Sequence, residues 1–240
     1  MKQFEMFELT FSGEVLQDDW ARIDLTAEFA CGEARKTVRG FYDGDGRYAV
    51  RFMPDMPGEW QWKVSGAVNA EGREICEPAE NAHGPVKAVG THFEYADGTL
   101  FIPFGTTVYA LAHQDDELTE QTLESLKAAP FNKVRMCVFP KHYDYNHNEP
   151  PFFPFEKKAD GGWDVNRPCM AFWHRFESIL KLIAAMDIQT DLILSHPYDR
   201  WGFAALPQKD NLIYLDYLLR RLAAFPKIWW SLANEYDLCM

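Results

Sequence analysis

The sequence lacks several features that would assign its 240 residues to a specialised class of protein. It has no apolar run long enough to cross a bilayer, and its N-terminus, Met-Lys-Gln-Phe-Glu, lacks the apolar segment of a signal peptide. Its five cysteines form no C-x-x-C pair and no His/Cys cluster, so neither a disulfide framework nor a structural zinc site is indicated. We therefore expect a cytoplasmic protein with reduced thiols and no membrane partner.

Positive charge is also scarce. The chain has 24 Lys and Arg against 36 Asp and Glu, a formal net charge of −12. Binding to a nucleic-acid backbone needs clustered cations, so a nucleic-acid partner is not expected. A neutral ligand such as a sugar is unaffected by this charge. The 8 Trp, 10 Tyr and 18 Phe suit the apolar faces of sugars, although such rings also fill cores.

Residues 1–90 have the pattern of a small all-β domain. Phe7, Leu9 and Phe11 alternate with polar residues, which gives a strand with one apolar and one polar face. The same period of two recurs at Ile23, Leu25, Ala27 and Phe29. Short strands at this spacing, separated by turns, predict an immunoglobulin-like β-sandwich.

Turn chemistry supports that prediction. Asp-Gly-Asp-Gly at 43–46 predicts a tight turn between strands at 38–42 and 48–52. After Pro57-Gly58, Trp60 and Trp62 alternate with polar residues, so we expect both rings to fill the core of the domain.

Residues 91–240 change to an alternation of strands and helices. Four apolar strands are expected at 100–104, 133–139, 188–195 and 228–233, and three helices at 118–129, 172–186 and 211–224. A long insertion, 140–169, follows the second strand. Parallel neighbours need such helical crossovers, so this part predicts the first half of a (β/α)8 TIM barrel.

A closed barrel needs eight strands, and only four are expected here. The first and fourth strands would then be exposed edges, which proteins normally cover or pair. We expect the chain alone either to form a homo-oligomer through these half-barrel edges or to have a poorly ordered barrel part.

The pair Asn234-Glu235 directly follows the fourth predicted strand. Catalytic groups of parallel α/β folds collect at the carboxyl ends of strands. A carboxylic acid there can protonate a glycosidic oxygen and later deprotonate a water, and an adjacent Asn can bind the 2-hydroxyl of the sugar. The pair therefore predicts a glycosidase acid/base, although Asn-Glu is also common in solvated loops.

Four segments together carry a family resemblance. I-W-W-S-L-A-N-E-Y-D (228–237) resembles strand four of the glycoside hydrolase clan typified by family 5 cellulases, and F-N-K-V-R-M (131–136) resembles strand two of that clan. F-I-P-F-G-T-T-V-Y-A-L (101–111) is similar to strand one of a bacterial group within the clan. G-F-Y-D-G-D-G-R-Y-A-V-R-F-M-P-D-M-P-G-E-W-Q-W (40–62) is similar to the β-sandwich domain that precedes the barrel in that group.

The resemblance implies a retaining O-glycoside hydrolase with Glu235 as acid/base and Asn234 beside it. It also implies that Arg135 orients the nucleophile, although a structural salt bridge of Arg135 is as good an interpretation from the residues alone. The nucleophile of the clan lies on strand seven, outside residues 1–240. The chain alone is thus expected to be an incomplete, inactive enzyme.

Other side chains follow the predicted strands and could bind an oligosaccharide or glycoside substrate. They are Tyr109, His142, Tyr143, His196, Tyr198 and Trp201. A structural role is the alternative for His196, as a histidine whose hydrogen bonds are satisfied within the fold, and for Trp201, as the cover of a core edge.

Two other functions stay open at this point. The chain could be a non-catalytic carbohydrate-binding or assembly protein that uses the sandwich and the aromatic loops. His142, Asp144 and His147, in the loop K-H-Y-D-Y-N-H-N-E, also allow a metal-dependent hydrolase, although metal sites usually show tighter clusters. We expect no cofactor and no metal.

Overall fold

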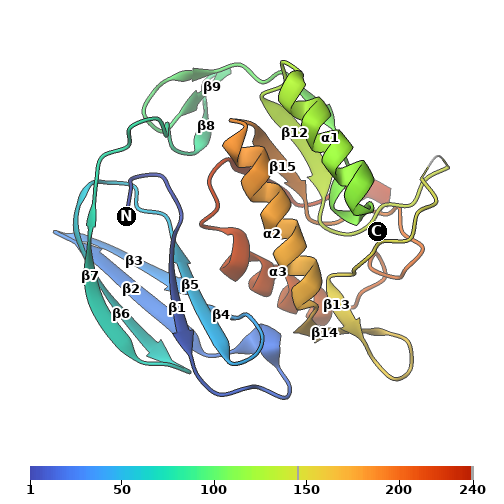
Figure 1. Ribbon diagram of the computed structural model, residues 1–240, viewed down its shortest axis with the longest axis horizontal. Helices are drawn as coiled ribbons and strands as arrows, with labels where there is room; N and C mark the ends of the chain where they lie inside the picture. The colour runs from blue at the N-terminus through green and yellow to red at the C-terminus, as the bar shows by residue number, and fades with distance from the viewer. Residues whose placement is uncertain (145, 239–240) are drawn as a thin grey trace. The chain divides into compact units, whose positions relative to one another are not determined.

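The computed structural model describes residues 1–144 and 146–238, and their packing divides into two compact units (Figure 1). The first, here called the N-terminal unit, consists of Met1–Phe101, Asp164–Pro168 and Leu212–Pro226. The remaining described residues form the second, here called the parallel-sheet unit. The boundary predicted between residues 90 and 91 stays a prediction.

The N-terminal unit is built from antiparallel sheets. One has the order β3-β2-β6-β7, with β3 (Ala34–Arg39), β2 (Leu25–Cys31), β6 (Gly58–Gly66) and β7 (Ala70–Cys76). A second has the order β1-β5-β4, with β1 (Phe7–Ser12), β5 (Arg47–Phe52) and β4 (Phe41–Tyr42). A third contains β10 (Leu100–Phe101), β9 (His92–Tyr95) and β8 (Val86–Val89); a short 3-10 helix, η1, spans Trp20–Arg22.

One hydrophobic core joins the first two sheets. Phe29 of β2 stacks on Phe52 of β5 with 4.1 Å between ring centroids, and Trp60 of β6 meets Phe52 edge-on at 4.9 Å. Trp60 is fully buried, and Trp62 is half-buried against the same core. The period-two pattern therefore identified inward residues correctly. The predominantly β character is confirmed, whereas the immunoglobulin-like topology stays a prediction.

The predicted turn at 43–46 is present between β4 and β5. The Asp43 N–H donates to the Arg47 carbonyl at 2.8 Å, and the Arg47 N–H donates to the Gly44 carbonyl at 2.8 Å. Gly44, Asp45 and Gly46 have positive φ angles, a conformation that Gly and Asp tolerate better than most residues. This turn holds Asp43 in a buried position.

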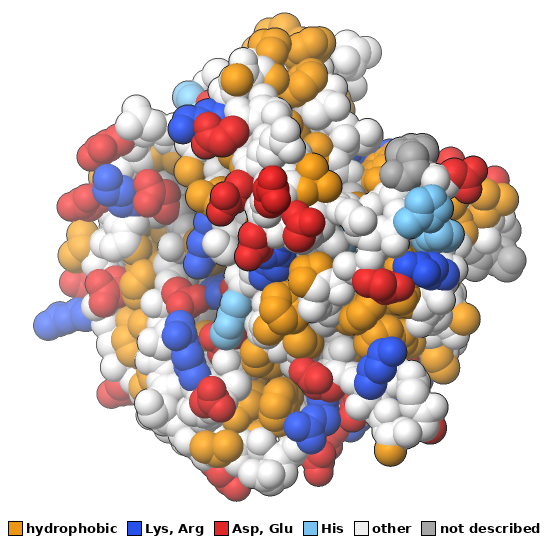
Figure 2. Space-filling view, turned by 45° about the vertical axis from the view of Figure 1, so that its right-hand side comes forward, with side chains coloured by type: hydrophobic (Ala, Val, Ile, Leu, Met, Phe, Trp, Pro, Cys, Tyr) orange, Lys and Arg blue, Asp and Glu red, His pale blue; other side chains and the backbone are white. Residues whose placement is uncertain are grey.

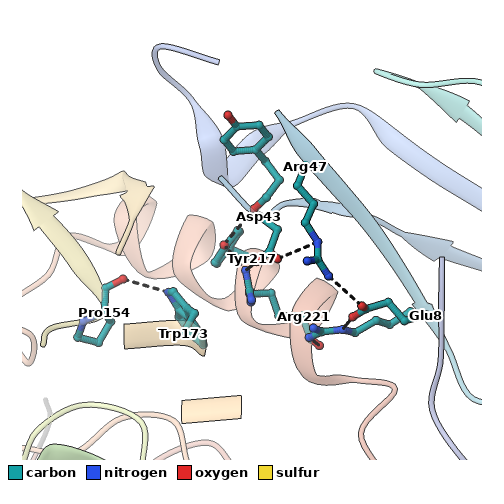
Figure 3. A network of polar contacts seen from close by, with 9 residues as sticks. Glu8, Asp43, Arg47, Pro154, Trp173, Tyr217 and Arg221 are labelled. Carbon is teal, nitrogen blue, oxygen red and sulfur yellow. Dashed lines mark hydrogen bonds and ion pairs between the residues drawn. The ribbon is translucent and has the colours of Figure 1, made fainter. Parts of the chain in front are cut away.

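A buried arginine lies next to that turn (Figure 3). Arg221, fully buried, donates through Nη1 to Asp43 Oδ1 at 2.7 Å and to the Tyr217 hydroxyl at 3.0 Å. Its guanidinium lies 4.5 Å from the centroid of the Phe41 ring. Arg221 and Tyr217 belong to helix α3 (Gln208–Leu222), so this end of α3 packs as part of the N-terminal unit.

Ion pairs extend this network towards β1. Arg47 pairs with Asp43 at 3.4 Å and with Glu8 at 3.3 Å, and Arg51 donates through Nε to Glu8 at 2.7 Å (Figure 3). Arg51 also donates to the Arg221 carbonyl at 2.7 Å. A buried charge is stable only when it is paired and hydrogen-bonded, and these contacts supply that condition.

The parallel-sheet unit contains an open sheet of four parallel strands in the order β11-β12-β15-β16, which confirms the expected parallel sheet. The strands are β11 (Gly105–Thr107), β12 (Lys133–Cys137), β15 (Gln189–Ile193) and β16 (Ile228–Ser231). Helices α1 (Asp116–Ala128) and α2 (Met170–Ala185) precede β12 and β15, and α3 precedes β16. The insertion after β12 holds the short strand β13 (Phe155–Lys157) and the start of β14 (Trp163–Pro168); η2 spans Leu111–His113 and η3 spans Tyr236–Leu238.

The first parallel strand lies later than predicted. Leu100 and Phe101, expected to begin it, instead pair antiparallel with Glu94 and Phe93, and the parallel strand is 105–107. An Asp97-Gly98 turn explains the difference, because the Tyr95 N–H donates to the Thr99 carbonyl at 2.8 Å and closes a hairpin. Pro103, which has no N–H to donate, separates that hairpin from β11.

Local signals set the ends of α1. The Leu118 N–H donates to the side chain of the N-cap residue Asp115 at 2.8 Å, and the helix ends before Pro130. The prediction of a helix at 118–129 is confirmed with a start two residues earlier.

The parallel sheet has one apolar and one polar face. Val134, Met136 and Leu192 are fully buried on the first, and α2 contacts β15. Lys133, Arg135 and Asp191 alternate with them on the second, where they are half-buried. Polar side chains of neighbouring strands therefore lie side by side on this face of the sheet.

The outer strands of the sheet are β11 and β16, as expected for half a barrel. Ile102 before β11 and Leu232 after β16 are 69% and 76% exposed. Figure 2 shows such hydrophobic side chains exposed among charged ones. Association of copies through these edges stays a prediction.

Two further observations concern the predicted surroundings of the protein. Cys31, Cys76, Cys137 and Cys169 are free thiols, whereas Cys239 lies outside the described residues. Within the described part of the chain, no helix has both the length and the apolar character needed to cross a membrane. The cytoplasmic location stays a prediction.

We predict that Asp43→Ala lowers the free energy of unfolding by about 3–5 kcal/mol, because it leaves the buried Arg221 guanidinium without its carboxylate. Urea denaturation followed by circular dichroism measures the change. Asp19→Ala is the control, since its pair with Arg22 is exposed and is worth at most about 1 kcal/mol. Equal effects of the two changes would contradict the prediction.

The second prediction concerns His113, which is buried at the end of η2 and stacks on Phe172 at 5.7 Å. The pKa of His113 is lowered to about 3, and burial is the main cause. Unfolding restores the ordinary pKa of about 6.5, so protons bind the unfolded chain first as pH falls. Stability is therefore complete above pH 6.5 and is lost below it, by up to about 1.4 kcal/mol per pH unit.

His113→Phe should remove this part of the pH dependence between pH 6.5 and pH 4, as measured by urea denaturation at several pH values. The control is His174→Phe, which makes the same replacement at an exposed position of α2 and so measures the effect of the substitution itself. A His113→Phe curve parallel to that of the unchanged protein would refute the assignment.

Candidate active site

Backbone hydrogen bonds continue past the carboxyl ends of the parallel strands and hold the following loops side by side. The Val138 N–H donates to Ile193 at 3.0 Å, and the Leu194 N–H donates to Ser231 at 2.9 Å. The Asn234 N–H donates to the Ser195 carbonyl at 3.0 Å. The segment that ends in Asn234-Glu235 is thereby fixed beside the loop that follows β15.

Glu235 has an unusual backbone conformation. Its φ angle is +51°, in the left-handed region that residues with a Cβ rarely adopt. Its carbonyl accepts the Leu238 N–H at 2.9 Å, which starts η3 directly after it. Asn234 is half-buried, and the Glu235 side chain is exposed to solvent. Such conformations concentrate at functional sites, so this one supports a functional role for Glu235.

Arg135 lies on the polar face of the sheet, half-buried. Its Nη2 donates to Ser231 Oγ of β16 at 3.2 Å, and its Nε lies 3.7 Å from Asp191 Oδ2 of β15. Asp191 also pairs with Lys133 at 3.5 Å. This arrangement provides the salt bridge that was one interpretation of Arg135. Its proposed role towards a nucleophile stays a prediction.

Lys141, four residues after β12, holds an ammonium group between tyrosine rings. Its Nζ is 4.0 Å from the ring centroid of Tyr109, 4.1 Å from that of Tyr198 and 5.6 Å from that of Tyr143. Within the described residues, no carboxylate forms an ion pair with this group and no acceptor hydrogen-bonds it. Its three N–H donors are thus held near aromatic faces and are free for a ligand.

Several charged groups act on the same ammonium. Burial lowers the pKa of Lys141, and the positive charge of Arg135 lowers it too. Cys137 and Glu235 act in the opposite direction and raise the pKa of Lys141. The carboxylate of Glu235 is therefore close enough to Lys141 to influence its charge.

His196 is buried in the loop after β15, 2% exposed. Its Nε2 lies 3.2 Å from the Phe139 carbonyl, and its ring stacks on Tyr198 at 6.2 Å. Burial lowers the pKa of His196, so the ring is neutral at pH 7. These contacts fit a structural role, in which His196 packs against Tyr198. That role is the alternative to substrate binding that the sequence left open for His196.

The rings of His142 and Trp201 pack edge-to-face, with 6.3 Å between their centroids. The backbone N–H of His142 donates to the Tyr198 carbonyl at 3.0 Å. The indole N–H of Trp201 donates to Glu149 at 2.9 Å, and Arg200 pairs with the same carboxylate. The half-buried Trp201 ring is therefore held in place by its loop rather than left free.

The loop after His142 brings its remaining candidates together only partly. The backbone of Tyr143 forms an isolated β-bridge with Asn146. The ring centroids of His142 and His147 are 6.0 Å apart, and Asp144 is exposed. Tyr145, also part of the predicted loop, lies outside the described residues. Among residues 1–144 and 146–238, no three His, Cys, Asp or Glu side chains are arranged to hold a metal.

The structure thus gathers Tyr109, Tyr143 and Tyr198 around Lys141, within electrostatic reach of Glu235 and Arg135. Sequence analysis did not select Lys141 or Asp191. For Asp191 the signal was available, because it is the charged residue inside the strand predicted at 188–195. For Lys141 there was none, since a lysine after a Pro in a polar loop is ordinarily solvated.

Two family models match the chain. The model of the apiosidase-like catalytic domain matches residues 88–239, and that of a domain of unknown function, DUF5060, matches residues 1–67. No curated protein matches the chain.

Solved structures give further matches. A candidate glycoside hydrolase from Bacteroides vulgatus is 41% identical, with a TM-score of 0.93 over 99% of this chain and 50% of its own. The chain thus spans about half the length of that relative. A family 5 glycoside hydrolase from the same organism matches with a TM-score of 0.48 and 17% identity, over 64% of this chain and 33% of its own. An endo-1,4-beta-mannanase from Rhizomucor miehei matches with a TM-score of 0.45 and 17% identity, over 62% of this chain and 48% of its own.

The two family models and the 41% identical structure confirm the resemblance to glycoside hydrolases with a domain in front of the catalytic one. The apiosidase-like model alone covers more than half of the residues. The chain belongs to the family of apiosidase-like catalytic domains, and a DUF5060 domain precedes that domain.

Proposed function

We propose that this chain forms the N-terminal half of a retaining O-glycoside hydrolase, with Glu235 as its acid/base. The observation that carries the proposal is the left-handed Glu235 directly after the fourth parallel strand, fixed by the bond from Asn234 to Ser195. In a retaining enzyme this carboxyl group first protonates the leaving oxygen and then deprotonates the attacking water. Asn234, half-buried beside it, would bind the 2-hydroxyl of the sugar.

The fold proposed for this half is an immunoglobulin-like sandwich followed by four strands of a (β/α)8 barrel. The parallel order β11-β12-β15-β16 and the helices between these strands support it. The polar face of the sheet, with Arg135 and Asp191, would then point into the barrel. Barrel interiors of this kind end in the catalytic loops.

Substrate contacts are proposed for the tyrosine-lysine cluster, which consists of Tyr109, Tyr143, Tyr198 and Lys141. Aromatic faces suit the C–H faces of a sugar ring, and the ammonium can donate to its hydroxyls. His142 and Trp201 would extend this surface along the loop. The family description makes glycosides of apiose the first substrates to try.

The nucleophile is proposed to come from outside residues 1–240. The two carboxyl groups of a retaining enzyme lie about 5 Å apart, and the resemblance assigns the second one to strand seven. The 41% identical candidate glycoside hydrolase, of which this chain covers 50%, has room for such strands in its other half. Residues 1–240 alone are thus expected to bind glycans without turnover.

We predict that Glu235→Gln, in a form that contains all eight strands, lowers the rate on glycosides with poor leaving groups by about 10²–10⁴-fold. The rate on activated aryl glycosides should fall much less, because their leaving groups need no proton. Steady-state hydrolysis of a panel that includes apiosides measures both rates.

Asp237→Asn provides the control, because Asp237 is an exposed acid two residues further along the same segment. It should leave the rates within a few fold. If the unchanged eight-strand form hydrolyses no glycoside at all, the hydrolase proposal fails, and a non-catalytic carbohydrate-binding protein becomes the better account.

A further prediction concerns Lys141. Lys141→Met should weaken oligosaccharide binding by about 10- to 150-fold, because the loss of one charged hydrogen bond costs roughly 1.5–3 kcal/mol. Titration followed by intrinsic fluorescence reports the affinity of residues 1–240. Lys133→Met is the matched control, since Lys133 also lies over an aromatic ring (Trp229, 3.6 Å) but at the start of β12. Similar losses in both variants would speak against a direct contact.

A further inference from the structure

A cavity in the N-terminal unit stands apart from the candidate active site. It has a volume of about 420 Å³ and lies between β3, the end of β5 and the part of α3 that belongs to this unit. Its apolar lining includes Val38, Phe52 and Leu219. All of these elements lie within one compact unit, so the cavity belongs to a single packed body.

The backbone of β3 offers hydrogen-bond donors to this cavity. β3 is an outer strand of its sheet, and among the strands that the structure describes it pairs only with β2. In an antiparallel pair, every second residue of a strand hydrogen-bonds to its partner strand. Gly40 bonds to Leu25 in this way, so Thr37 and Arg39, at odd spacing from Gly40, are residues of β3 that do not bond to β2. Their N–H groups point away from β2, and within the described residues no backbone acceptor receives them.

The opposite wall lacks a strand that could use those donors. β5 pairs with β4 only as far as Ala49, so no described strand neighbours Arg51 and Phe52 on that side. Helix α3 lies there instead, and it contributes Asp216 and Arg220 to the lining. A peptide strand would need a long open edge, so a cavity of this size between strand and helix favours a small ligand.

Positive charge dominates the lining. Lys36, Arg39, Arg51 and Arg220 face a single carboxylate, that of Asp216. Arg51 and Arg220 are buried and held by fixed acceptors, among them the Arg221 carbonyl for the first and the Ile23 carbonyl for the second. Arg51 also pairs with Glu8 at 2.7 Å and Arg220 with Asp216 at 2.7 Å, so the two outer cations, Lys36 and Arg39, supply the charge that a ligand would meet.

The two outer cations can change partners easily. Lys36 pairs with Asp55 at 2.8 Å and Arg39 pairs with Asp216 at 2.7 Å. Both cations are about half exposed, and exposed ion pairs contribute little to stability. Lys36 and Arg39 can therefore form ion pairs with a bound anion without the loss of a buried interaction.

We propose that this cavity binds a small oxyanion, a phosphate or carboxylate group carried by a metabolite or sugar. The N–H groups of Thr37 and Arg39 and the side chains of Lys36 and Arg39 hold its oxygens, and the apolar lining accommodates the rest of the ligand. The combination of free backbone donors with cationic side chains is the arrangement that proteins use for such groups.

The test uses ¹H–¹⁵N NMR of the 240-residue chain titrated with inorganic phosphate at pH 7. The expected result is saturable movement of the Thr37 and Arg39 amide signals, weakened by added salt. Glucose 6-phosphate and glucuronate distinguish a phosphate ligand from a carboxylate one, and glucose is the neutral comparison. Absence of saturable movement with every anion, or equal movement with glucose, overturns the proposal.

Single variants distinguish binding in this cavity from non-specific attraction of anions to surface cations. Arg39→Gln and Lys36→Gln should each weaken binding by about tenfold, the loss of one charge-assisted contact. Arg35→Gln is the matched control, because Arg35 is an exposed cation on the same strand that donates to the Gly32 and Ala34 carbonyls and does not line the cavity. Equal weakening in all three variants overturns the proposal.

Discussion

The parallel ladder of β11, β12, β15 and β16 is the constraint on which the candidate site depends. Because all four strands run in one direction, their following loops emerge at one edge of the sheet. Backbone bonds beyond the strands, such as that from Asn234 to Ser195, extend this alignment into the loops. Side chains from four separate parts of the sequence thereby reach one ammonium group, that of Lys141.

The N-terminal unit depends on a different kind of interaction, a charge held inside an apolar environment. Arg221 is fully buried, and its environment combines a carboxylate, a phenol and the face of Phe41. A hydrophobic residue at this place would pack against almost any neighbour, whereas a guanidinium accepts few arrangements. The position of the 43–46 turn and the end of α3 are thus tied to each other.

Sequence analysis predicted what depends on local patterns. The turn at 43–46, the burial of Trp60, the span of α1 and the four parallel strands all follow from residue types within short windows. The prediction was wrong where two local signals competed. The apolar run at 100–104 was predicted to be the first strand of the parallel sheet, whereas the Asp97-Gly98 turn pairs Leu100 and Phe101 with β9 in a hairpin. Contacts between distant segments left no local signal.

Among those distant contacts are the tyrosine rings around Lys141 and the carboxylate beside Arg221. A lysine in a polar loop and an arginine near a helix end are ordinarily exposed, so composition and periodicity give no reason to expect otherwise. Asn234-Glu235 was found because its signal is positional: it directly follows a strand. The site could be located from the sequence in outline, and its cationic centre could not.

The left-handed backbone of Glu235 sets stability and chemistry against each other at one residue. A non-glycine residue in such a conformation costs on the order of 1 kcal/mol or more, and glycine would avoid that cost. A library selected only for thermal resistance would therefore favour glycine at position 235 and discard the carboxyl group with it. Engineering for robustness in this fold has to hold that position fixed and look for stabilising changes elsewhere.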